Sequence, residues 1–300
     1  MQDIYKNRVR LLIDVLSLIN WDGCFALKGG TAINFFVEPM PRLSVDIDLA
    51  YIRLTDRDSA IAEMKACLKE FTSIFSKHSL MTEHTSISSN NPVGKLKVSS
   101  SDASIIVEPN INLRGTLLPV EKRLINGAVS DLFLKETEVT ILSENELYSG
   151  KLIAMLDRQH PRDIFDMYWY LKKTNNTINF LDYFIVYLVQ TNRPFHEIIK
   201  PNILDISHVY EHSFKGMTES DFSLELLERT RQSVTDNLHK QLTENQIDFL
   251  ISILKLAPAW DLLPFDNIDQ LPGVKWRLMN IKKMPEDKRY YEIRELEKLL

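Results

Sequence analysis

Two aspartates separated by one residue, Asp46 and Asp48, give the first chemical signal in the sequence. They lie in the run RLSVDIDLAYI, where polar and apolar residues alternate as in a strand with one face in a core. Side chains two residues apart on a strand share a face and lie about 7 Å apart, so these carboxylates repel each other unless a cation lies nearby. Carboxylate oxygens are ligands that Mg²⁺ prefers. The pair therefore predicts a divalent-metal site, and the alternative is a solvated strand face.

A glycine pair precedes the aspartates in the stretch LKGGTAINFF. A short apolar run precedes the glycine pair and a helix-compatible run follows it. We therefore expect a strand, a tight turn and the start of a helix. Exposed backbone amides and the positive end of a helix dipole bind phosphate at such turns. The turn alone is a weak signal, because many strand-to-helix turns use glycine. Together with the downstream aspartates it predicts a bound metal–nucleoside triphosphate, held by Gly29, Gly30 and Thr31.

A second charged group lies in the run KLIAMLDRQHPRDIFD. Lys151 and Arg158 are two helical turns apart, and Asp163 and Asp166 are three residues apart after a proline that favours a new helix, so each pair shares a helix face. In a functional interpretation the cations bind nucleotide phosphates and the aspartates orient them. The alternative is a structural salt-bridge network that joins two helices. The residues by themselves leave both interpretations open.

The elements that must position these residues divide into two halves. Strand-like and helical runs alternate up to about residue 142, with a long helix expected at 56–77 and strands expected near 80–88, 93–100 and 103–113. From SENELYSGKLIAML onward the pattern is helical almost to the end, and Ser143 followed by Glu146 resembles a capping box. We therefore predict an α/β domain with a mixed sheet at 1–142 and a helical C-terminal domain at 143–300.

Composition limits the classes of function. The chain has 300 residues, of which 44% are hydrophobic and 26% charged, as in ordinary globular proteins. Its formal net charge of −5 means that nucleic acid can bind only at a local basic patch, for which KWRLMNIKKMPEDKR at 275–289 is the best candidate, although a solvated face is an equal alternative. Cys24 and Cys67 are far apart and offer no partner pattern, which argues against a disulfide framework and indicates a reducing compartment.

The N-terminal run resembles an amphipathic helix and not a signal peptide, because charges are interspersed among its apolar residues. We find no apolar stretch long enough to cross a bilayer. The sequence therefore predicts a cytoplasmic protein with no membrane partner.

The order KGGTAINFF then RLSVDIDL resembles the opening motif of DNA-polymerase-β-like nucleotidyltransferases. More narrowly, it is similar to the AbiEii/AbiGii (MenT-like) toxins of type IV toxin–antitoxin systems. KLIAMLDRQHPRDIFDMYW resembles that family's Lys-Leu, Asp-Arg and Arg-Asp-X-X-Asp elements, and IIVEPNINLRGT resembles its VEVN-x-x-LRGT pattern. The last match points to Glu108 as a third carboxylate. Pro109 departs from the pattern, because proline removes a ladder donor and is usual only at strand edges or bulges.

The resemblance implies a nucleotidyltransferase fold with a mixed sheet and a helical C-terminal domain, and an enzyme that transfers a nucleotide from an NTP to an acceptor hydroxyl with release of pyrophosphate. It implies Mg²⁺ or Mn²⁺ as cofactor, with the metal ligands Asp46, Asp48 and Glu108. The catalytic residues it implies are Asp46, Asp48, Lys151 and Asp163. The nucleotide-binding residues it implies are Gly29, Gly30, Thr31, Lys151 and Arg158.

The resemblance also implies an RNA acceptor, the 3′ end of tRNA, and toxicity through blocked translation. A cognate antitoxin, expected to be a winged-helix protein, would be the protein partner. Two alternatives remain at this point: a nucleotidyltransferase that acts on a small molecule or a protein hydroxyl, and a nucleotide-binding regulator without catalysis. Labelling of the acceptor from radiolabelled NTP distinguishes them.

Overall fold

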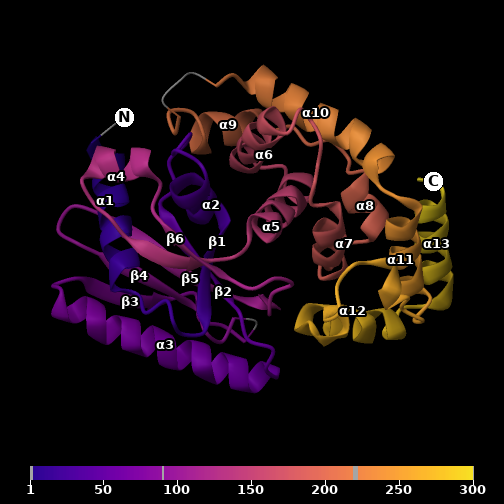
Figure 1. The fold of residues 1–300 in the computed structure, drawn as a ribbon, viewed down its shortest axis with the longest axis horizontal. Coiled ribbons are helices and arrows are strands. Elements are labelled where there is room, and N and C mark those ends of the chain that lie inside the picture. The colour runs from indigo at the N-terminus through magenta and orange to yellow at the C-terminus, as the bar shows by residue number, and fades with distance from the viewer. Residues whose placement is uncertain (1–2, 90, 219–221, 300) are drawn as a thin grey trace. The chain divides into compact units, whose positions relative to one another are not determined.

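The computed structural model describes residues 3–89, 91–218 and 222–299, and the chain forms two compact units (Figure 1). The first comprises Met1–Leu147 with Gly216–Ser220, and the second comprises Tyr148–Lys215 with Asp221–Leu300. The division falls inside helix α5 (Glu144–Asp157), whereas the boundary expected from the sequence lies just before that helix.

A mixed sheet forms the centre of the first unit (Figure 1). Among the described residues it has seven strands in the order β3-β4-β5-β2-β1-β7-β6, where β2 pairs antiparallel with β1 and parallel with β5. The strands are β1 (Phe25–Lys28), β2 (Asp46–Tyr51), β3 (Met81–Thr85), β4 (Lys95–Ser99), β5 (Ser104–Arg114), β6 (Glu121–Leu124) and β7 (Glu138–Ile141). The mixed sheet confirms the predicted α/β fold class.

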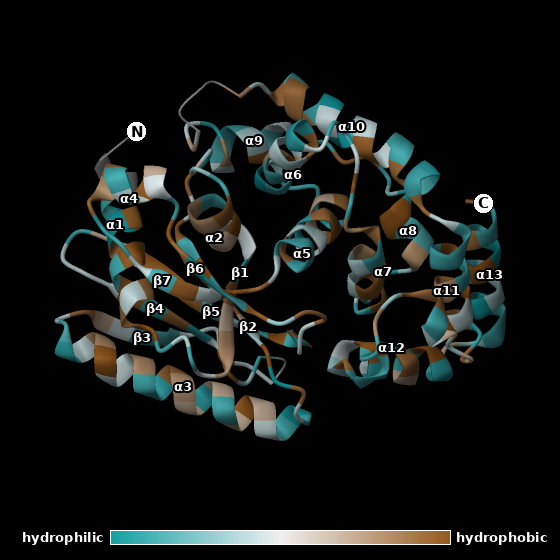
Figure 2. Ribbon diagram, in the orientation of Figure 1, coloured by the Kyte–Doolittle hydropathy of each residue, from teal (hydrophilic) through white to brown (hydrophobic). Residues whose placement is uncertain are grey.

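The helices of the first unit are α1 (Asp3–Leu18), α2 (Gly29–Ala32), the π-helical turn η1 (Ile33–Val37), α3 (Arg57–Lys77) and α4 (Gly127–Phe133). Among them, α1, α2 and α3 pack against strands of this sheet. Helix α3 has the bounds that its periodicity predicts, and Asp56 caps it by accepting hydrogen bonds from the amides of Asp58 and Ser59. Figure 2 shows the resulting alternation of hydrophilic and hydrophobic residues along α3. The sequence did not predict β6, α4 or β7, and β7 pairs directly with β1.

The second unit is helical, as predicted. Helix α5 continues into it, and the other α-helices are α6 (Pro161–Lys173), α7 (Leu181–Val189), α8 (Phe195–Ile199), α9 (Ser207–Ser213), α10 (Leu224–Gln241), α11 (Glu244–Leu254), α12 (Pro272–Lys283) and α13 (Glu286–Glu297). Two short 3₁₀ turns lie at Trp260–Leu262 and Ile268–Gln270. The apolar residues of α7 and α11 form part of the core. In the described part of the chain, no helix combines the length and apolar character needed to cross a membrane.

The start of α5 is capped differently from the expected capping box. The amide of Glu146 donates to Ser143 Oγ at 3.4 Å, as predicted. The Glu146 carboxylate, however, accepts hydrogen bonds from the amides of Leu117 and Leu118, at 2.9 and 3.3 Å. Glu146 is buried, so its charge needs these donors, and it thereby ties the helix start to the loop after β5.

The two cysteines, which showed no partner pattern in the sequence, are neighbours in the fold. Cys24, just before β1, and Cys67, on α3, are free thiols whose Sγ atoms lie 3.3 Å apart. The hydrogen bond between them, together with burial, raises the pKa of Cys24. The contact joins the residue that precedes β1 to helix α3.

Candidate functional site

The two aspartates lie on β2, between its neighbours β1 and β5 in the sheet. Ile47 and Leu49 are fully buried, whereas Asp46 and Asp48 are half-buried and face the other way, as the alternation predicts. Both carboxylates are therefore fixed by a central strand and not by a mobile loop.

Strand register places four charged residues in one row across the sheet. Asp48 lies directly opposite Lys28 of β1 on one side and Glu108 of β5 on the other. On the far side of Glu108, the β4–β5 ladder brings Lys95 next to it, and Lys95 Nζ lies 2.7 Å from Glu108 Oε2. Neighbouring strands are about 4.8 Å apart, so the order across the sheet is lysine, glutamate, aspartate, lysine, with the two carboxylates adjacent.

A pocket of about 250 Å³ lies beside this row. Its lining comprises Lys28, Asp48, Asn91, Glu108, Pro109, Asn110, Ile111 and Asn112. Asn110 Oδ1 accepts hydrogen bonds from the amides of Asn112 and Leu113, both at 3.0 Å, and so stabilises the bulge at which β5 shifts its register against β2. The bulge turns the end of β5 into one wall of the pocket.

Pro109 does not displace Glu108. Opposite β2, the register runs unbroken from the pair Asp48 and Glu108 to the pair Leu49 and Pro109. The pairing of β5 with β4 ends at Val107, so Pro109 lies beyond that pairing, where a missing amide donor is tolerated. Glu108 is therefore aligned with Asp48 despite the departure from the family pattern.

The glycine turn directly contacts this row of charges. Gly29 has a φ of +72°, and a Cβ atom at this position would come within 2.4 Å of Asp48 Oδ2. At Gly30, a Cβ atom would come within 2.6 Å of Arg42 Nη2. The turn thus requires glycine for its backbone conformation and for the close approach of two charged side chains.

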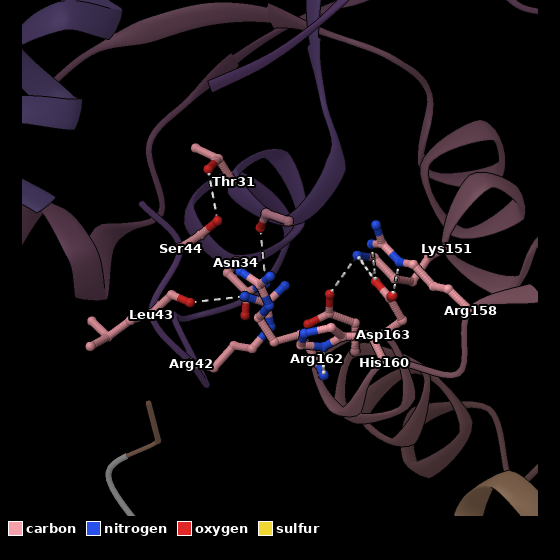
Figure 3. A network of polar contacts seen from close by, with 12 residues as sticks. Thr31, Asn34, Arg42, Leu43, Ser44, Lys151, Arg158, His160, Arg162 and Asp163 are labelled. Atoms are coloured by element: carbon pink, nitrogen blue, oxygen red, sulfur yellow. Dashed lines mark hydrogen bonds and ion pairs between the residues drawn. The ribbon is translucent and has the colours of Figure 1, made fainter. Parts of the chain in front are cut away.

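Thr31 fastens the turn to β2. Its hydroxyl is buried and lies within hydrogen-bonding distance of Ser44 Oγ, at 2.9 Å, and of the Asp46 carbonyl oxygen (Figure 3). Asn34 Nδ2 donates to the Gly30 carbonyl at 2.9 Å and braces the same turn. In this arrangement the Thr31 hydroxyl positions the strand that carries the aspartates.

In the second unit, the predicted cations and aspartates form one ion-pair network between α5 and α6 (Figure 3). Lys151 Nζ lies 2.9 Å from Asp163 Oδ1 and 3.0 Å from Asp166 Oδ2. Arg158 donates to both oxygens of Asp163, at 2.6 and 3.0 Å. The Nδ1 atom of His160 accepts from the Arg162 amide at 3.1 Å, so His160 caps α6.

Burial separates the members of this network. The side chains of Lys151 and Asp163 are 7% and 1% exposed, whereas that of Arg158 is 63% exposed. Burial opposes the charged form of Asp163, but Lys151 and Arg158 outweigh it and hold the pKa of this carboxyl well below its usual range. Lys151 and Arg158 thus form ion pairs with buried carboxylates, as in the structural alternative, and the Arg158 side chain faces solvent.

The three predicted metal ligands do not converge. Across residues 3–89, 91–218 and 222–299, no group of three or more His, Cys, Asp or Glu side chains is arranged to hold a metal ion. The Glu108 carboxylate is directed to Lys95. Mg²⁺ in nucleotide sites is commonly bound by one or two carboxylates together with substrate phosphates, and the oxygen donors of Asp46 and Asp48 fit that mode.

Sequence reasoning missed two members of the row, Lys28 and Lys95. Lys28 directly precedes the glycine pair, which is a usable signal for a residue near the turn. Lys95 lies in the alternating run VGKLKVSS, but the sequence carries no local signal for the strand that it pairs with. Both were therefore absent from the predicted site.

A family model described as nucleotidyl transferase AbiEii toxin, type IV TA system, matches residues 10–265. Among solved structures, the chain is similar to MenT4, a nucleotidyltransferase toxin from Mycobacterium tuberculosis H37Rv, with a TM-score of 0.61 and 13% sequence identity over 99% of this chain and 93% of that one. At this identity the likeness concerns the fold. No curated protein matches the chain significantly.

Proposed function

The chain belongs to the AbiEii family of nucleotidyltransferase toxins of type IV toxin–antitoxin systems, and from this premise we propose that it transfers a nucleotide from an NTP to RNA. Family membership makes it a nucleotidyltransferase with an NTP substrate and an antitoxin partner. The acceptor that we propose is the 3′-terminal hydroxyl of tRNA, whose modification blocks translation in the cytoplasm. The antitoxin that we propose is a winged-helix protein.

The observation that carries the proposal is the position of Asp48. The Asp48 carboxylate lies close to the glycine turn at Gly29, a kind of turn that can bind phosphate. Asp48 is also paired with Glu108 on the neighbouring strand, and both residues line the pocket. Asp46 and Asp48 supply oxygen ligands for a divalent cation, and the amides of Gly29 and Gly30 supply donors for phosphate oxygens. Thr31 keeps the turn and the strand in this relation.

A bound Mg²⁺ or Mn²⁺ supplies the charge that neutralises a triphosphate and lowers the pKa of an acceptor hydroxyl. The chain's own residues bind and orient the reactants. Lys28 contributes a second positive charge to the pocket, where it can pair with a phosphate oxygen. The asparagine side chains that line the pocket offer amide groups for a sugar or a base.

For the second unit we propose that Arg158 is the cation that meets nucleotide phosphate. Its guanidinium is exposed, and both of its hydrogen bonds to Asp163 hold it in one orientation. Lys151 and Asp163 remain predicted catalytic residues, and their burial supports a role in positioning Arg158. An oriented guanidinium suits phosphate better than a freely rotating one, because less side-chain entropy is lost on binding.

An RNA acceptor is supported by the exposed surface of α12. Lys275, Lys282 and Lys283 are exposed there, together with Trp276 and Met279. A basic surface with an exposed indole suits single-stranded RNA, because phosphates pair with ammonium groups and bases stack on aromatic rings. Arg277 does not belong to this surface, since it is buried and donates to the Arg193 carbonyl oxygen at 3.1 Å.

The test is an acceptor-labelling experiment with the full chain. The protein is incubated with total cellular RNA, Mg²⁺ and each radiolabelled NTP in turn, with and without EDTA. A discrete EDTA-sensitive band of tRNA size supports the proposal. If label appears only on protein or on small molecules, and RNA stays unlabelled with all four nucleotides, the acceptor is a protein or a small molecule and the RNA proposal is wrong.

A further inference from the structure

We propose that Lys95 controls the access of a divalent cation to Glu108: it pairs with this carboxylate in the metal-free protein and releases it when a cation binds beside Asp48. The inference rests on the proposed metal-dependent function and adds a positioning residue to it. It explains why the three predicted ligands do not converge in the structure, although Glu108 and Asp48 are in register.

The first observation is the geometry of the pair. Lys95 opens β4, and its Nζ lies 2.7 Å from Glu108 Oε2, while Glu108 stands directly opposite Asp48 on the neighbouring strand. The side chains of Lys95 and Glu108 are 33% and 37% exposed. An ion pair of this exposure is weak, because water screens both charges, so Glu108 can exchange its partner at small cost.

The second observation is the order of charges across the sheet. Adjacent strands are about 4.8 Å apart, so carboxylates on directly opposite residues of two such strands repel each other unless positive charge is present. Lys95 and Lys28 stand at the two ends of this row and balance it. A divalent cation between Asp48 and Glu108 has to compete with these ammonium groups. Lys95 opposes the cation directly, because its ammonium is in contact with the Glu108 carboxylate.

Exchange of partners also links the cation to the nucleotide. When Glu108 turns to the cation, the Lys95 ammonium loses its carboxylate and becomes available to a phosphate oxygen. A cation that arrives with a triphosphate therefore costs less to bind than a cation alone. The row of charges thus favours the metal–nucleotide complex over the free metal ion.

Lys97 provides a matched control. It lies two residues further along β4 and so projects from the same face. Its ammonium lies 3.9 Å from Glu83 Oε2, on the β3 side of β4, whereas the ammonium that pairs with Glu108 is that of Lys95. Replacement of either lysine removes one positive charge from the same strand, and only the replacement of Lys95 frees Glu108.

The experiment measures Mn²⁺ affinity by calorimetry for the full chain without nucleotide. We expect Lys95→Met to bind Mn²⁺ about three- to tenfold more tightly than the unmodified protein, because a competing charge on one ligand is gone. Lys97→Met should stay within about twofold, since its charge is farther from the ligands. Lys95→Arg keeps the charge and should bind like the unmodified protein. The gain should vanish in Lys95→Met combined with Glu108→Gln.

Thermal melts give a second readout that does not depend on activity. In EDTA, Lys95→Met should melt below the unmodified protein, because Glu108 loses its ammonium partner and faces the Asp48 carboxylate. Mn²⁺ should raise the melting temperature of this variant by more than that of the unmodified protein. If Lys95→Met is too unstable to purify, the same Mn²⁺ titrations and thermal melts are made with Lys95→Gln and with the single variant Glu108→Gln. In the Glu108→Gln background, the choice of residue at position 95 should no longer affect Mn²⁺ binding.

Two failures are distinguishable. If the unmodified protein binds Mn²⁺ and labels RNA, but Lys95→Met binds Mn²⁺ with unchanged or weaker affinity, Lys95 is a structural residue and the inference is wrong. If the unmodified protein neither binds Mn²⁺ with NTP nor transfers a nucleotide in its presence, the proposed metal-dependent function fails and the inference fails with it.

Discussion

Asp48 is the residue at which the features of the first unit meet. It lies against Gly29, opposite Lys28 and opposite Glu108. In the second unit, several interactions likewise meet at one carboxylate, that of Asp163, because Lys151 and Arg158 both form ion pairs with it. We propose that Asp48 binds an added cation, whereas Asp163 is paired with two cations of the chain.

For Asp48, we expect Asp48→Asn to lower nucleotide transfer by roughly a hundredfold or more, since an amide is a poor ligand for Mg²⁺. The replacement has the same shape and removes one charge, so stability should change by no more than about 1 kcal/mol. Labelling kinetics and urea denaturation measure the two effects. Asp102→Asn, an exposed residue between β4 and β5, is the control and should leave both quantities unchanged. Full activity in Asp48→Asn would contradict the assignment.

For Lys151, we expect Lys151→Met to destabilise the fold by about 3–5 kcal/mol, because it leaves Asp163 and Asp166 buried without their shared cation. Lys255→Met, at the exposed lysine directly after α11, should change the free energy of unfolding little. Urea denaturation measures both. If transfer per folded molecule also falls by orders of magnitude in Lys151→Arg, which keeps the charge, the lysine takes part in binding or catalysis as well. Near-normal transfer in that variant would leave Lys151 with the structural role alone.

The pKa of Asp163 predicts how stability depends on pH. Because this pKa is lower in the folded than in the unfolded protein, the ionised carboxylate stabilises the fold above about pH 4, the unfolded value, and this stabilisation is lost as the pH falls further. Urea denaturation from pH 7 down to pH 3 should therefore show a falling free energy of unfolding. The slope should be smaller in Asp163→Asn. Equal slopes in the two proteins would show that other carboxylates cause the loss.

At the scale of elements, the glycine turn and β2 act as one unit. The turn needs a positive φ at Gly29 and needs space for the Asp48 carboxylate, while Thr31 holds it to the start of the strand. A short helix follows and passes into a π-helical turn, so the phosphate-binding proposal rests on the amides of the turn more than on the dipole of a long helix.

We expect Gly29→Ala to destabilise the protein by about 1–3 kcal/mol, because alanine at this φ is strained and its Cβ would meet Asp48 Oδ2. It should also lower transfer, since Asp48 has to move. Gly127→Ala is the control: a Cβ at this first position of α4 meets no atom within 4 Å. That change should leave stability equal or raise it by up to about 1 kcal/mol. Similar effects of the two replacements would mean that neither the positive φ at Gly29 nor the close approach of Asp48 requires glycine at this position.

At the scale of the whole molecule, charge decides how RNA could bind. The formal net charge of −5 repels phosphate, so binding must rely on a local concentration of positive charge. The α12 surface offers such a concentration in the second unit, whereas Arg277 and Glu292 of the same region are buried together. Only part of the basic cluster found in the sequence is therefore available to a partner.

We expect the double change Lys282→Glu and Lys283→Glu to reduce RNA labelling by at least tenfold without altering NTP affinity, because these residues would contact only the acceptor backbone. Labelling by the unmodified protein should also fall steeply with added salt. The control is Lys65→Glu with Lys69→Glu on the exposed side of α3, which changes net charge equally. Equal losses in both double variants would indicate a non-specific charge effect.

The sequence by itself determined the local elements and the family. Alternation predicted β2, periodicity predicted α3 with its bounds, and the two motifs around Gly29 and Asp46 led to the AbiEii family, which the family comparison confirms. These features depend on neighbouring residues, because φ, side-chain alternation and helix periodicity are properties of short segments. The residues that we propose as metal ligands on β2 were found for this reason.

Only the tertiary structure decided which distant residues meet. Lys95, Glu108, Asp48 and Lys28 come from four strands, and strand order and register depend on how whole apolar faces pack, which no short segment encodes. The same holds for the contact of Cys24 with Cys67 and for the carboxylate of Glu146, which accepts hydrogen bonds from loop amides as well as from the Ser143 hydroxyl at its own helix start. A shift of one residue in the β2–β5 register would turn Glu108 to the other face of the sheet, so the site exists only once that pairing is fixed.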